Sequence, residues 1–263
     1  MAESLSPILQ PLVDHAPDAL LVLDFDGTIS AIVDHPADAV AVDGVIDTLR
    51  GIAGLLTVAF ITGRPVDWLV ERTAPLAEHG VEYIGLHGHE RLRRGEIVAH
   101  PESGKWRAEI DAALARAQRD APDDVVIERK GLALSLHYRT SRTAEEWIRR
   151  FCDDTVRASG LVAHDTRLSV ELRPPVELDK GDAMRELLDE HQPSAVAFFG
   201  DDVVDLPAVH AMRSHAGVAS VAVFVDNVEG PRAFADVADL VLPSPAAAAD
   251  ALGALLAALR ARR

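Results

Sequence analysis

The sequence has only one cysteine and no long apolar run. Cys152 cannot form a disulfide within the chain, so the composition fits a reducing compartment, with the thiol packed in a core. A membrane helix needs about 18 or more consecutive apolar residues, and no segment reaches that length. The N-terminus also lacks the basic stretch and apolar core of a secretory signal. We therefore expect a cytoplasmic protein without a membrane segment.

Basic residues are scarce. The chain has 26 lysines and arginines but 42 aspartates and glutamates, which gives a formal net charge of −16 over 263 residues. A protein that binds nucleic acid needs a basic surface against the phosphate backbone, so the composition argues against such a partner. An acidic protein that binds a small anion needs local positive charge. Any lysine, arginine or metal ion in its pocket therefore gains importance.

What the sequence does contain is an apolar run that leads into two aspartates. Residues 20–23 are all apolar, and Asp24, Asp26, Gly27 and Thr28 follow within five positions. A run without alternation predicts a strand buried on both faces, typical of a parallel sheet between helices. The carboxyl end of such a strand is where open α/β sheets bind ligands. An ordinary turn is the alternative, but a turn needs no pair of acids.

The two aspartates suit metal-assisted phosphate chemistry. Asp24 can act as nucleophile and metal ligand, because a carboxylate divides a difficult displacement into two steps through an acyl phosphate. A divalent cation would screen the charge between this carboxylate and an anionic phosphate. Asp26 would then be the proton donor and, in the second step, the proton acceptor.

A second buried strand is predicted for residues 56–61, and it ends in the same way. Thr62 follows the strand, and Pro65 suits the first turn of the next helix. The free N–H groups at a helix start form an anion site, so we predict that Thr62 binds phosphate. A turn with an incidental threonine is the alternative.

A lysine and three acids complete the pattern. Lys180 stands at the start of a predicted helix, where a cation opposes the helix dipole, so it indicates an anionic partner. The apolar run 195–199 leads to Asp201, Asp202 and Asp205. Such hard oxygen ligands suit Mg²⁺.

The sequence pattern changes between residues 93 and 176. Its strand signals alternate apolar and polar residues, which predicts an antiparallel sheet with one covered face. We therefore expect an α/β core formed by residues 1–92 and 177–263, with 93–176 inserted as an α+β cap. Charged residues on an exposed sheet face are usually solvated, but a shared polar face would also suit sugar hydroxyls. The residues of this face are Glu128, Lys130, His137, Arg139, Glu171 and Arg173.

Taken in order, these motifs resemble those of the haloacid dehalogenase-like phosphatases. The matching positions are residues 24–28, Thr62, Lys180 and residues 200–205. Within that superfamily, the glycine- and histidine-rich stretch 85–90 is similar to one in trehalose-6-phosphate phosphatases. The cap segments 128–131, 137–139 and 170–174 are similar to that family as well. By this resemblance the chain is identified as a member of the trehalose-6-phosphate phosphatase family.

The resemblance implies a Rossmann-like core with a parallel sheet flanked by helices, and Mg²⁺-dependent hydrolysis of trehalose 6-phosphate through an aspartyl phosphate. A sugar-phosphate synthase of the same pathway could be a partner. The implied catalytic residues are Asp24, Asp26, Thr62 and Lys180. The implied metal ligands are Asp24, the carbonyl of Asp26, Asp201, Asp202 and Asp205. The implied substrate-binding residues are Arg64, His87, Glu128, Lys130, Arg139 and Glu171.

The fourth motif leaves the substrate open. Val204 and Leu206 stand where the family usually has threonine and glutamate, so a sucrose, glycosylglycerate or pseudo-disaccharide phosphate is the alternative. A silent sugar-phosphate sensor should have lost the aspartates that are present here, and a phosphomutase would return the phosphoryl group to a sugar. Zinc binding by residues 87–90 lacks a complete ligand set. The segment 226–230 could border the pocket or form an ordinary turn.

Overall fold

The structure is a computed structural model, and it describes residues 4–33, 36–138, 142–166, 168–227 and 232–262. The chain divides into two compact units. The first comprises Met1–Ile97 and Leu178–Arg263, and the second comprises Val98–Glu177. The second unit begins at Val98 rather than at residue 93, because two strands that sequence patterns did not predict extend the first sheet.

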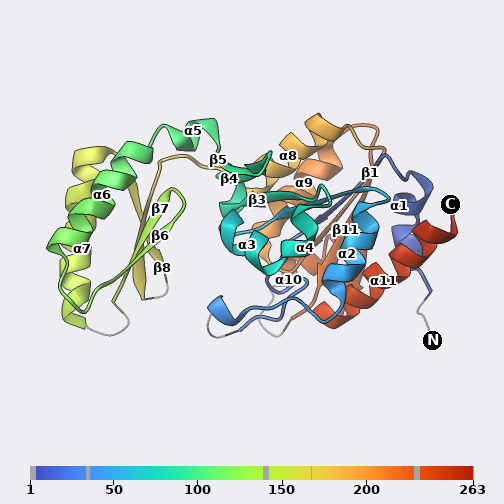
Figure 1. Ribbon diagram of the computed structural model, residues 1–263, viewed down its shortest axis with the longest axis horizontal. Coiled ribbons are helices and arrows are strands. Elements are labelled where there is room, and N and C mark those ends of the chain that lie inside the picture. The colour runs from blue at the N-terminus through green and yellow to red at the C-terminus, as the bar shows by residue number, and fades with distance from the viewer. Residues whose placement is uncertain (1–3, 34–35, 139–141, 167, 228–231, 263) are drawn as a thin grey trace. The chain divides into compact units, whose positions relative to one another are not determined.

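The first unit is built on an eight-stranded sheet in the order β12-β11-β10-β1-β2-β3-β4-β5 (Figure 1). Neighbouring strands from β12 to β3 are parallel, and β4 is antiparallel to β3. The predicted α/β class is therefore confirmed. The strands are β1 (Ala19–Leu23), β2 (Thr57–Ile61), β3 (Glu82–Gly85), β4 (Glu90–Arg93), β5 (Glu96–Ala99), β10 (Ala195–Gly200), β11 (Ala219–Val225) and β12 (Leu240–Leu242).

Both faces of this sheet are covered by apolar side chains. Leu21 and Leu23 of β1 lie in one buried cluster, and Leu20 and Val22 lie in another, so alternate residues of one strand serve two cores. The first cluster includes residues of α1 (Gln10–Asp14), α2 (Val45–Ala53), α3 (Val66–Arg72), α4 (Ala74–Ala77) and α11 (Pro245–Ala261). The second includes residues of α8 (Lys180–His191), α9 (Leu206–Ser214) and α10 (Arg232–Ala235).

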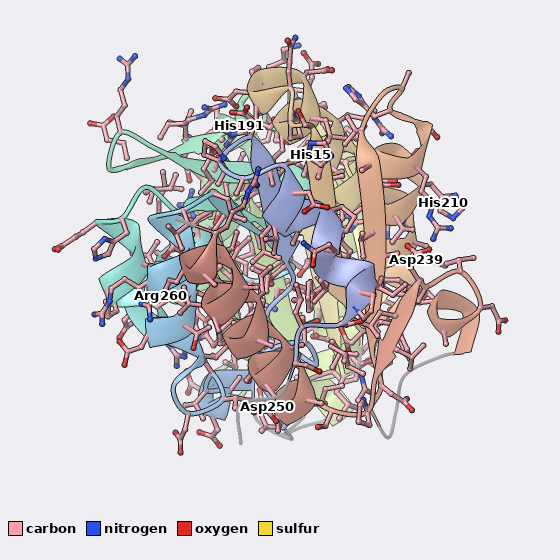
Figure 2. All side chains as sticks on the ribbon, turned by 90° about the vertical axis from the view of Figure 1, so that its right-hand side faces the viewer. His15, His191, His210, Asp239, Asp250 and Arg260 are labelled. Atoms are coloured by element: carbon pink, nitrogen blue, oxygen red, sulfur yellow. The ribbon has the colours of Figure 1, made fainter. Side chains whose placement is uncertain are left out.

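Helix α11 shows how composition is divided between core and surface. Leu252, Leu255 and Leu259 are buried, whereas Asp250 and Arg260 are exposed on the outside of the helix (Figure 2). Alanine-rich segments between these residues favour the helix itself. Across the described residues, no helix combines the length and apolar character needed to cross a membrane.

The second unit is an antiparallel sheet covered on one face. Its strand order is β6-β7-β9-β8. Leu134, Leu136 and Leu172 pack with Ile110 and Ile148 of the helices in a single core. The elements are α5 (Pro101–Gly104), α6 (Arg107–Asp120), β6 (Val126–Lys130), β7 (Ala133–His137), α7 (Arg142–Ser159), β8 (Val162–Thr166) and β9 (Ser169–Arg173). Trp106 and Trp147 are partly buried against this core.

Candidate active site

The polar residues of the four motifs meet at the carboxyl edge of the first sheet. β1 lies between β10 and β2, so the residues that follow these three strands are neighbours. Asp24 follows β1, Thr62 follows β2, Asp201 follows β10, and Lys180 is the first residue of α8. A cavity of about 300 Å³ lies between them. Its polar lining comprises Asp24, Asp26, Thr62, Arg64, His87, Lys180, Asp201 and Asp202.

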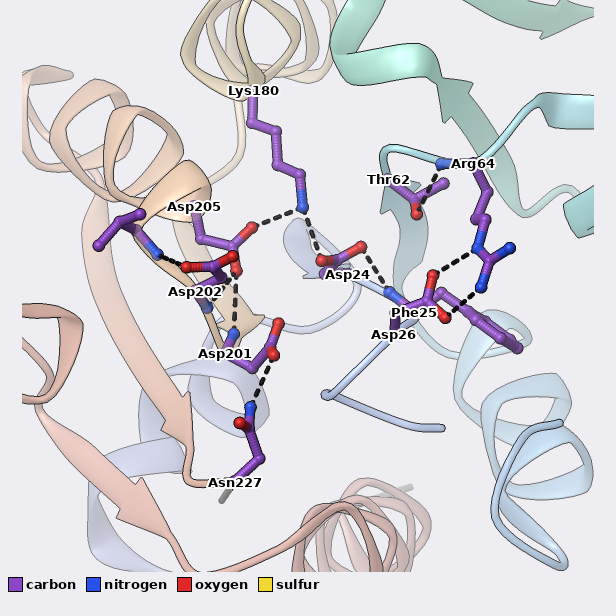
Figure 3. A network of polar contacts seen from close by, with 11 residues as sticks. Asp24, Phe25, Asp26, Thr62, Arg64, Lys180, Asp201, Asp202, Asp205 and Asn227 are labelled. Carbon is purple, nitrogen blue, oxygen red and sulfur yellow. Dashed lines mark hydrogen bonds and ion pairs between the residues drawn. The ribbon is translucent and has the colours of Figure 1, made fainter. Parts of the chain in front are cut away.

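Lys180 is buried, and its ammonium group bridges two carboxylates (Figure 3). Nζ lies 2.7 Å from Asp24 Oδ2 and 2.6 Å from Asp205 Oδ1. Burial alone would lower the pKa of Lys180, but the charges of Asp205 and Asp24 outweigh it and hold the pKa above its ordinary value. The N-terminus of a helix disfavours a cation, and the two ion pairs with Asp24 and Asp205 offset this cost. Lys180 is thus a fixed positive charge beside Asp24.

The Asp24 carboxylate is held by donors on both oxygens. Oδ2 accepts from Lys180, and Oδ1 accepts from the backbone N–H of Phe25 at 2.7 Å. Burial raises the pKa of Asp24 to about 6, although Lys180 acts in the opposite direction. The carboxylate therefore has a single orientation at the edge of the cavity, which an attacking group requires.

Three carboxylates form a group that fits a divalent cation. Oxygens of Asp24, Asp201 and Asp205 lie within 4.8 Å of one another. Burial, followed by repulsion from Asp24 and Asp205, raises the pKa of Asp201 to about 8. Asp201 Oδ2 also accepts from the amide of Asn227 at 2.7 Å. Concentrated negative charge on hard oxygen donors is what a small divalent cation would neutralise.

The two other acids of this loop already have protein donors. Asp205 Oδ2 accepts from the backbone N–H groups of Asp201 and Asp202 at 2.9 and 3.1 Å, while Oδ1 accepts from Lys180. Asp202 Oδ1 accepts from the N–H of Val203 at 2.5 Å and caps a short 3-10 helix, Val203–Asp205. Among the described residues, Asp202 is not part of the group of three carboxylates. Asp205 therefore shapes the loop that presents Asp201, while its carboxylate also belongs to the group of three.

Gly27 makes room for this group. Its φ is +70°, and a Cβ at this position would lie 1.9 Å from Asp201 Oδ2. Any side chain here would displace the Asp201 carboxylate, and only glycine adopts such a backbone at little cost. The glycine of the first motif is therefore required by the acid of the fourth.

On the other side of Asp24, an arginine holds the second aspartate. Arg64 donates from Nε to Asp26 Oδ2 at 2.6 Å and from Nη2 to Oδ1 at 2.7 Å. The N–H of Arg64 also donates to Thr62 Oγ1 at 3.3 Å. Thr62 is buried, so its hydroxyl is fixed at the end of β2. Arg64, predicted to bind substrate, thus contacts the predicted proton donor.

The histidine-rich stretch lies beside this loop. His87 has a left-handed backbone, with φ +58°, and its N–H donates to the carbonyl of Thr62 at 3.0 Å. A Cβ on Gly63 would come within 2.9 Å of the His87 imidazole, so glycine permits this contact. Glu90 accepts from the N–H of Val66 at 2.6 Å and thereby caps α3. Among the described residues, no group with metal-ligand geometry includes these histidines, so the zinc alternative has no support.

The second unit carries a polar sheet face on β6, β7 and β9. Lys130 Nζ lies 3.4 Å from Glu128 Oε2 and 4.0 Å from Glu171 Oε2. His137 Nε2 lies 3.0 Å from Glu128, and Ser135 donates to Glu171 at 3.0 Å. The expected substrate-binding residues of this sheet are therefore neighbours on one face. Arg139 lies outside the described residues.

Sequence patterns did not identify three of these polar partners. Asn227 falls in the segment 226–230, for which the sequence allows either a border of the pocket or an ordinary turn, and nothing in its surroundings along the chain points to Asp201. Ser135 and His164 share the polar face, because they pair across the sheet with Glu171. Strict alternation along β7 could have revealed Ser135, whereas β8, which carries His164, was not predicted.

Comparisons with known proteins identify the family of this chain. The family described as Trehalose-phosphatase matches residues 22–237. A trehalose-phosphate phosphatase of Mycobacterium marinum is 32% identical over 261 residues, covering 92% of this chain and 64% of the relative. The chain therefore spans somewhat less than two thirds of that relative's length.

Solved structures share the fold. A trehalose-6-phosphate phosphatase related protein has a TM-score of 0.68 at 22% identity, covering 90% of this chain and 97% of that one. The trehalose-6-phosphate phosphatase of Aspergillus fumigatus has a TM-score of 0.61 at 23% identity, covering 97% of this chain and 99% of that one. The resemblance inferred from the motifs is thus confirmed. Since the family match extends over most of its length, the chain belongs to the trehalose-phosphatase family.

Proposed function

We propose that this chain is a Mg²⁺-dependent phosphatase that hydrolyses trehalose 6-phosphate to trehalose and phosphate. The observation that carries the proposal is the buried Asp24 carboxylate, which Lys180 and a backbone N–H orient at the edge of a cavity shared with Asp201. The substrate is supported by the relative from Mycobacterium marinum, which is a trehalose-phosphate phosphatase.

In the first step, the substrate phosphate would bind against Lys180 and the Thr62 hydroxyl. An oxygen of Asp24 forms a bond to phosphorus, and the bond from phosphorus to the sugar oxygen breaks. Asp26 gives its proton to that oxygen, so that trehalose leaves as a neutral alcohol. The product on the chain is an aspartyl phosphate.

In the second step, Asp26 takes a proton from a water molecule as the water attacks phosphorus. The bond between phosphorus and Asp24 breaks, and inorganic phosphate leaves. Asp24 is again a carboxylate, and Asp26 again carries a proton. The two aspartates are therefore regenerated in each turnover.

The metal would be held by the carboxylates of Asp24 and Asp201 and by the backbone carbonyl of Asp26. When bound, Mg²⁺ would neutralise the charge between the Asp24 carboxylate and the substrate phosphate. Asp205 would contribute mainly through Lys180 and the loop N–H groups, and Asp202 through its cap, as their hydrogen bonds suggest.

Sugar recognition is proposed for the polar face of the second sheet. The Lys130 ammonium lies within 4.0 Å of a carboxylate oxygen of both Glu128 and Glu171, a spacing suited to adjacent sugar hydroxyls. Val204 lines the cavity and is 45% exposed, where the family usually has threonine. This apolar position favours, as a second candidate, a sugar phosphate other than trehalose 6-phosphate.

The experiment that tests this function measures phosphate release with Mg²⁺ from trehalose 6-phosphate, sucrose 6-phosphate, glucose 6-phosphate and mannosyl-3-phosphoglycerate. A preference for trehalose 6-phosphate of about two orders of magnitude or more supports the proposed substrate. A stronger preference for another sugar phosphate would replace it. The Asp24→Asn variant should fold and lose turnover, and full activity in this variant would contradict its role as nucleophile.

Two further expectations concern the surroundings of the enzyme. A sugar-phosphate synthase would supply the substrate, and association with it can be tested by co-purification of the two proteins. A cytoplasmic location is proposed from the single cysteine, which is free and buried.

A further inference from the structure

The proposed proton donor, Asp26, is oriented by Arg64 through a planar fork. The two contacts, at 2.6 and 2.7 Å, use one nitrogen for each carboxylate oxygen (Figure 3). The side chains of Arg64 and Asp26 are 18% and 34% exposed, so water only partly competes with this contact. A fork on a carboxylate fixes direction as well as distance. Whatever orients Arg64 therefore also orients Asp26.

Trp68 is the side chain that orients Arg64. The Arg64 guanidinium lies 4.2 Å from the centroid of the Trp68 ring. The same ring packs edge-on against Phe25, with 5.4 Å between centroids and an interplanar angle of 86°. Phe25 is fully buried and directly precedes Asp26. The contacts thus form a closed loop from Asp26 through Arg64 and Trp68 back to Phe25.

A second arginine secures the ring. The guanidinium of Arg72 lies 4.0 Å from the Trp68 centroid, and its Nη2 donates to the carbonyl of Ala37 at 2.8 Å. Among the aromatic side chains, tryptophan attracts a guanidinium above its ring face most strongly. Leucine could fill much of the same volume, but it would not attract either arginine. The ring is therefore suited to hold Arg64 in place as well as to fill space.

We propose that Trp68 is a positioning residue for the proton that Asp26 gives to the leaving group. This inference rests on the proposed function. As the bond from Asp24 to phosphorus forms and the bond to the leaving oxygen breaks, the proton moves from the Asp26 carboxyl to that oxygen. A single hydrogen bond from Arg64 suffices to hold the protonated Asp26 carboxyl. The other carboxyl oxygen of Asp26 can then carry the proton. Without Trp68, the fork and the carboxyl would sample other directions.

Aryl phosphates test this directly, because they carry no sugar. The leaving group of p-nitrophenyl phosphate departs without a proton, whereas that of phenyl phosphate is more basic and benefits from one. The kinetic constant to measure is kcat/KM with Mg²⁺, which reports the steps up to departure of the leaving group. General acid catalysis contributes about 10²- to 10⁴-fold, so its partial loss is measurable.

In Trp68→Leu, we expect kcat/KM to fall less than about threefold for p-nitrophenyl phosphate and about tenfold or more for phenyl phosphate. Trp68→Phe keeps an aromatic face and should stay close to wild type for both. Arg64→Lys keeps the charge but loses the fork, so it should reproduce the unequal loss. Trp147→Leu, in the second unit, is a control expected to leave the ratio between the two substrates unchanged.

Equal losses for both aryl phosphates in Trp68→Leu would overturn the inference, since they would show a structural role only. If Trp68→Leu does not fold, the Arg64→Lys variant tests the inference instead. Equal losses of kcat/KM for both aryl phosphates in that variant would also overturn it. Adding Trp68→Leu to Asp26→Asn should not change the substrate ratio further, because the proton donor is already absent. A wild type that hydrolyses neither aryl nor sugar phosphates would overturn the proposed function itself, and this inference with it.

Discussion

Replacing Asp201 by asparagine should stabilise the metal-free protein, and increasingly so as the pH rises from 5 to 8. Burial, with repulsion from Asp24 and Asp205, raises the pKa of Asp201 from 3.8 to about 8. Between these values the folded protein retains a proton that the unfolded chain has released, so the stability of the wild type falls as the pH rises. Asparagine carries no charge and can still accept from Asn227. The stability of the Asp201→Asn variant should therefore not fall through ionisation at this position.

The size of the effect follows from the pKa. A move from 3.8 to about 8 sets an upper limit of about 6 kcal/mol, at about 1.4 kcal/mol per pH unit. Relaxation around the buried charge and entry of water reduce the cost, so we expect a gain of roughly 2–4 kcal/mol at pH 8. Each kcal/mol moves the Tm of a chain of this size by roughly 2–4 °C, so the variant should melt roughly 5–15 °C higher.

Calorimetric or fluorescence melting in EDTA between pH 5 and pH 8 measures this difference. Added Mg²⁺ should raise the Tm of the wild type at pH 8 and have little effect on Asp201→Asn. Asp226→Asn removes an exposed carboxylate next to Asn227 in the chain and serves as the matched control, which should melt like the wild type across this pH range. Equal melting temperatures for Asp201→Asn and the wild type at pH 8 in EDTA would refute the reasoning.

Three further outcomes are expected. Lys180→Met should lower the free energy of unfolding by about 3–5 kcal/mol, because Asp24 and Asp205 lose their buried partner, and a loss below about 1 kcal/mol in urea titrations would contradict this. Asn227→Ala should weaken Mg²⁺ activation of phosphate release about 10-fold or more by freeing the carboxylate it orients, and an unchanged Mg²⁺ titration would exclude that role. Burial raises the pKa of Cys152 to about 12, so a disulfide reagent at pH 8 should label it only after unfolding, and rapid labelling of the native protein would contradict this burial.

The central strands were predictable because their patterns allow one structure only. Residues 20–23 and 195–199 are continuous apolar runs, and both lie within strands buried on both faces, β1 and β10. The acids that follow them are then forced to one edge of the sheet. The position of the site therefore follows from two short apolar runs and the rule that parallel strands end together.

The strands that escaped prediction are those without such patterns. Three of the four residues of β5, Glu96–Ala99, are exposed, and β8, Val162–Thr166, contains a single large apolar residue. Their pairing depends on the neighbouring strand rather than on their own burial. His87 is a different case, because it has a left-handed backbone, with φ +58°, just after β3 ends at Gly85, and histidine itself does not predict such a turn.

Pairing between distant side chains decides what each acid does, and sequence supplies only the candidates. Asp205 belongs to the group of three carboxylates, and its oxygens also accept from Lys180 and from two backbone N–H groups. It therefore supplies half of the charge that keeps the lysine buried. When all groups are ionised, the carboxylates of Asp24, Asp201 and Asp205 carry three negative charges and the Lys180 ammonium carries one positive charge. The group therefore has two buried negative charges in excess. A single divalent cation balances that excess, whereas a monovalent one leaves a buried charge beside an entering phosphate.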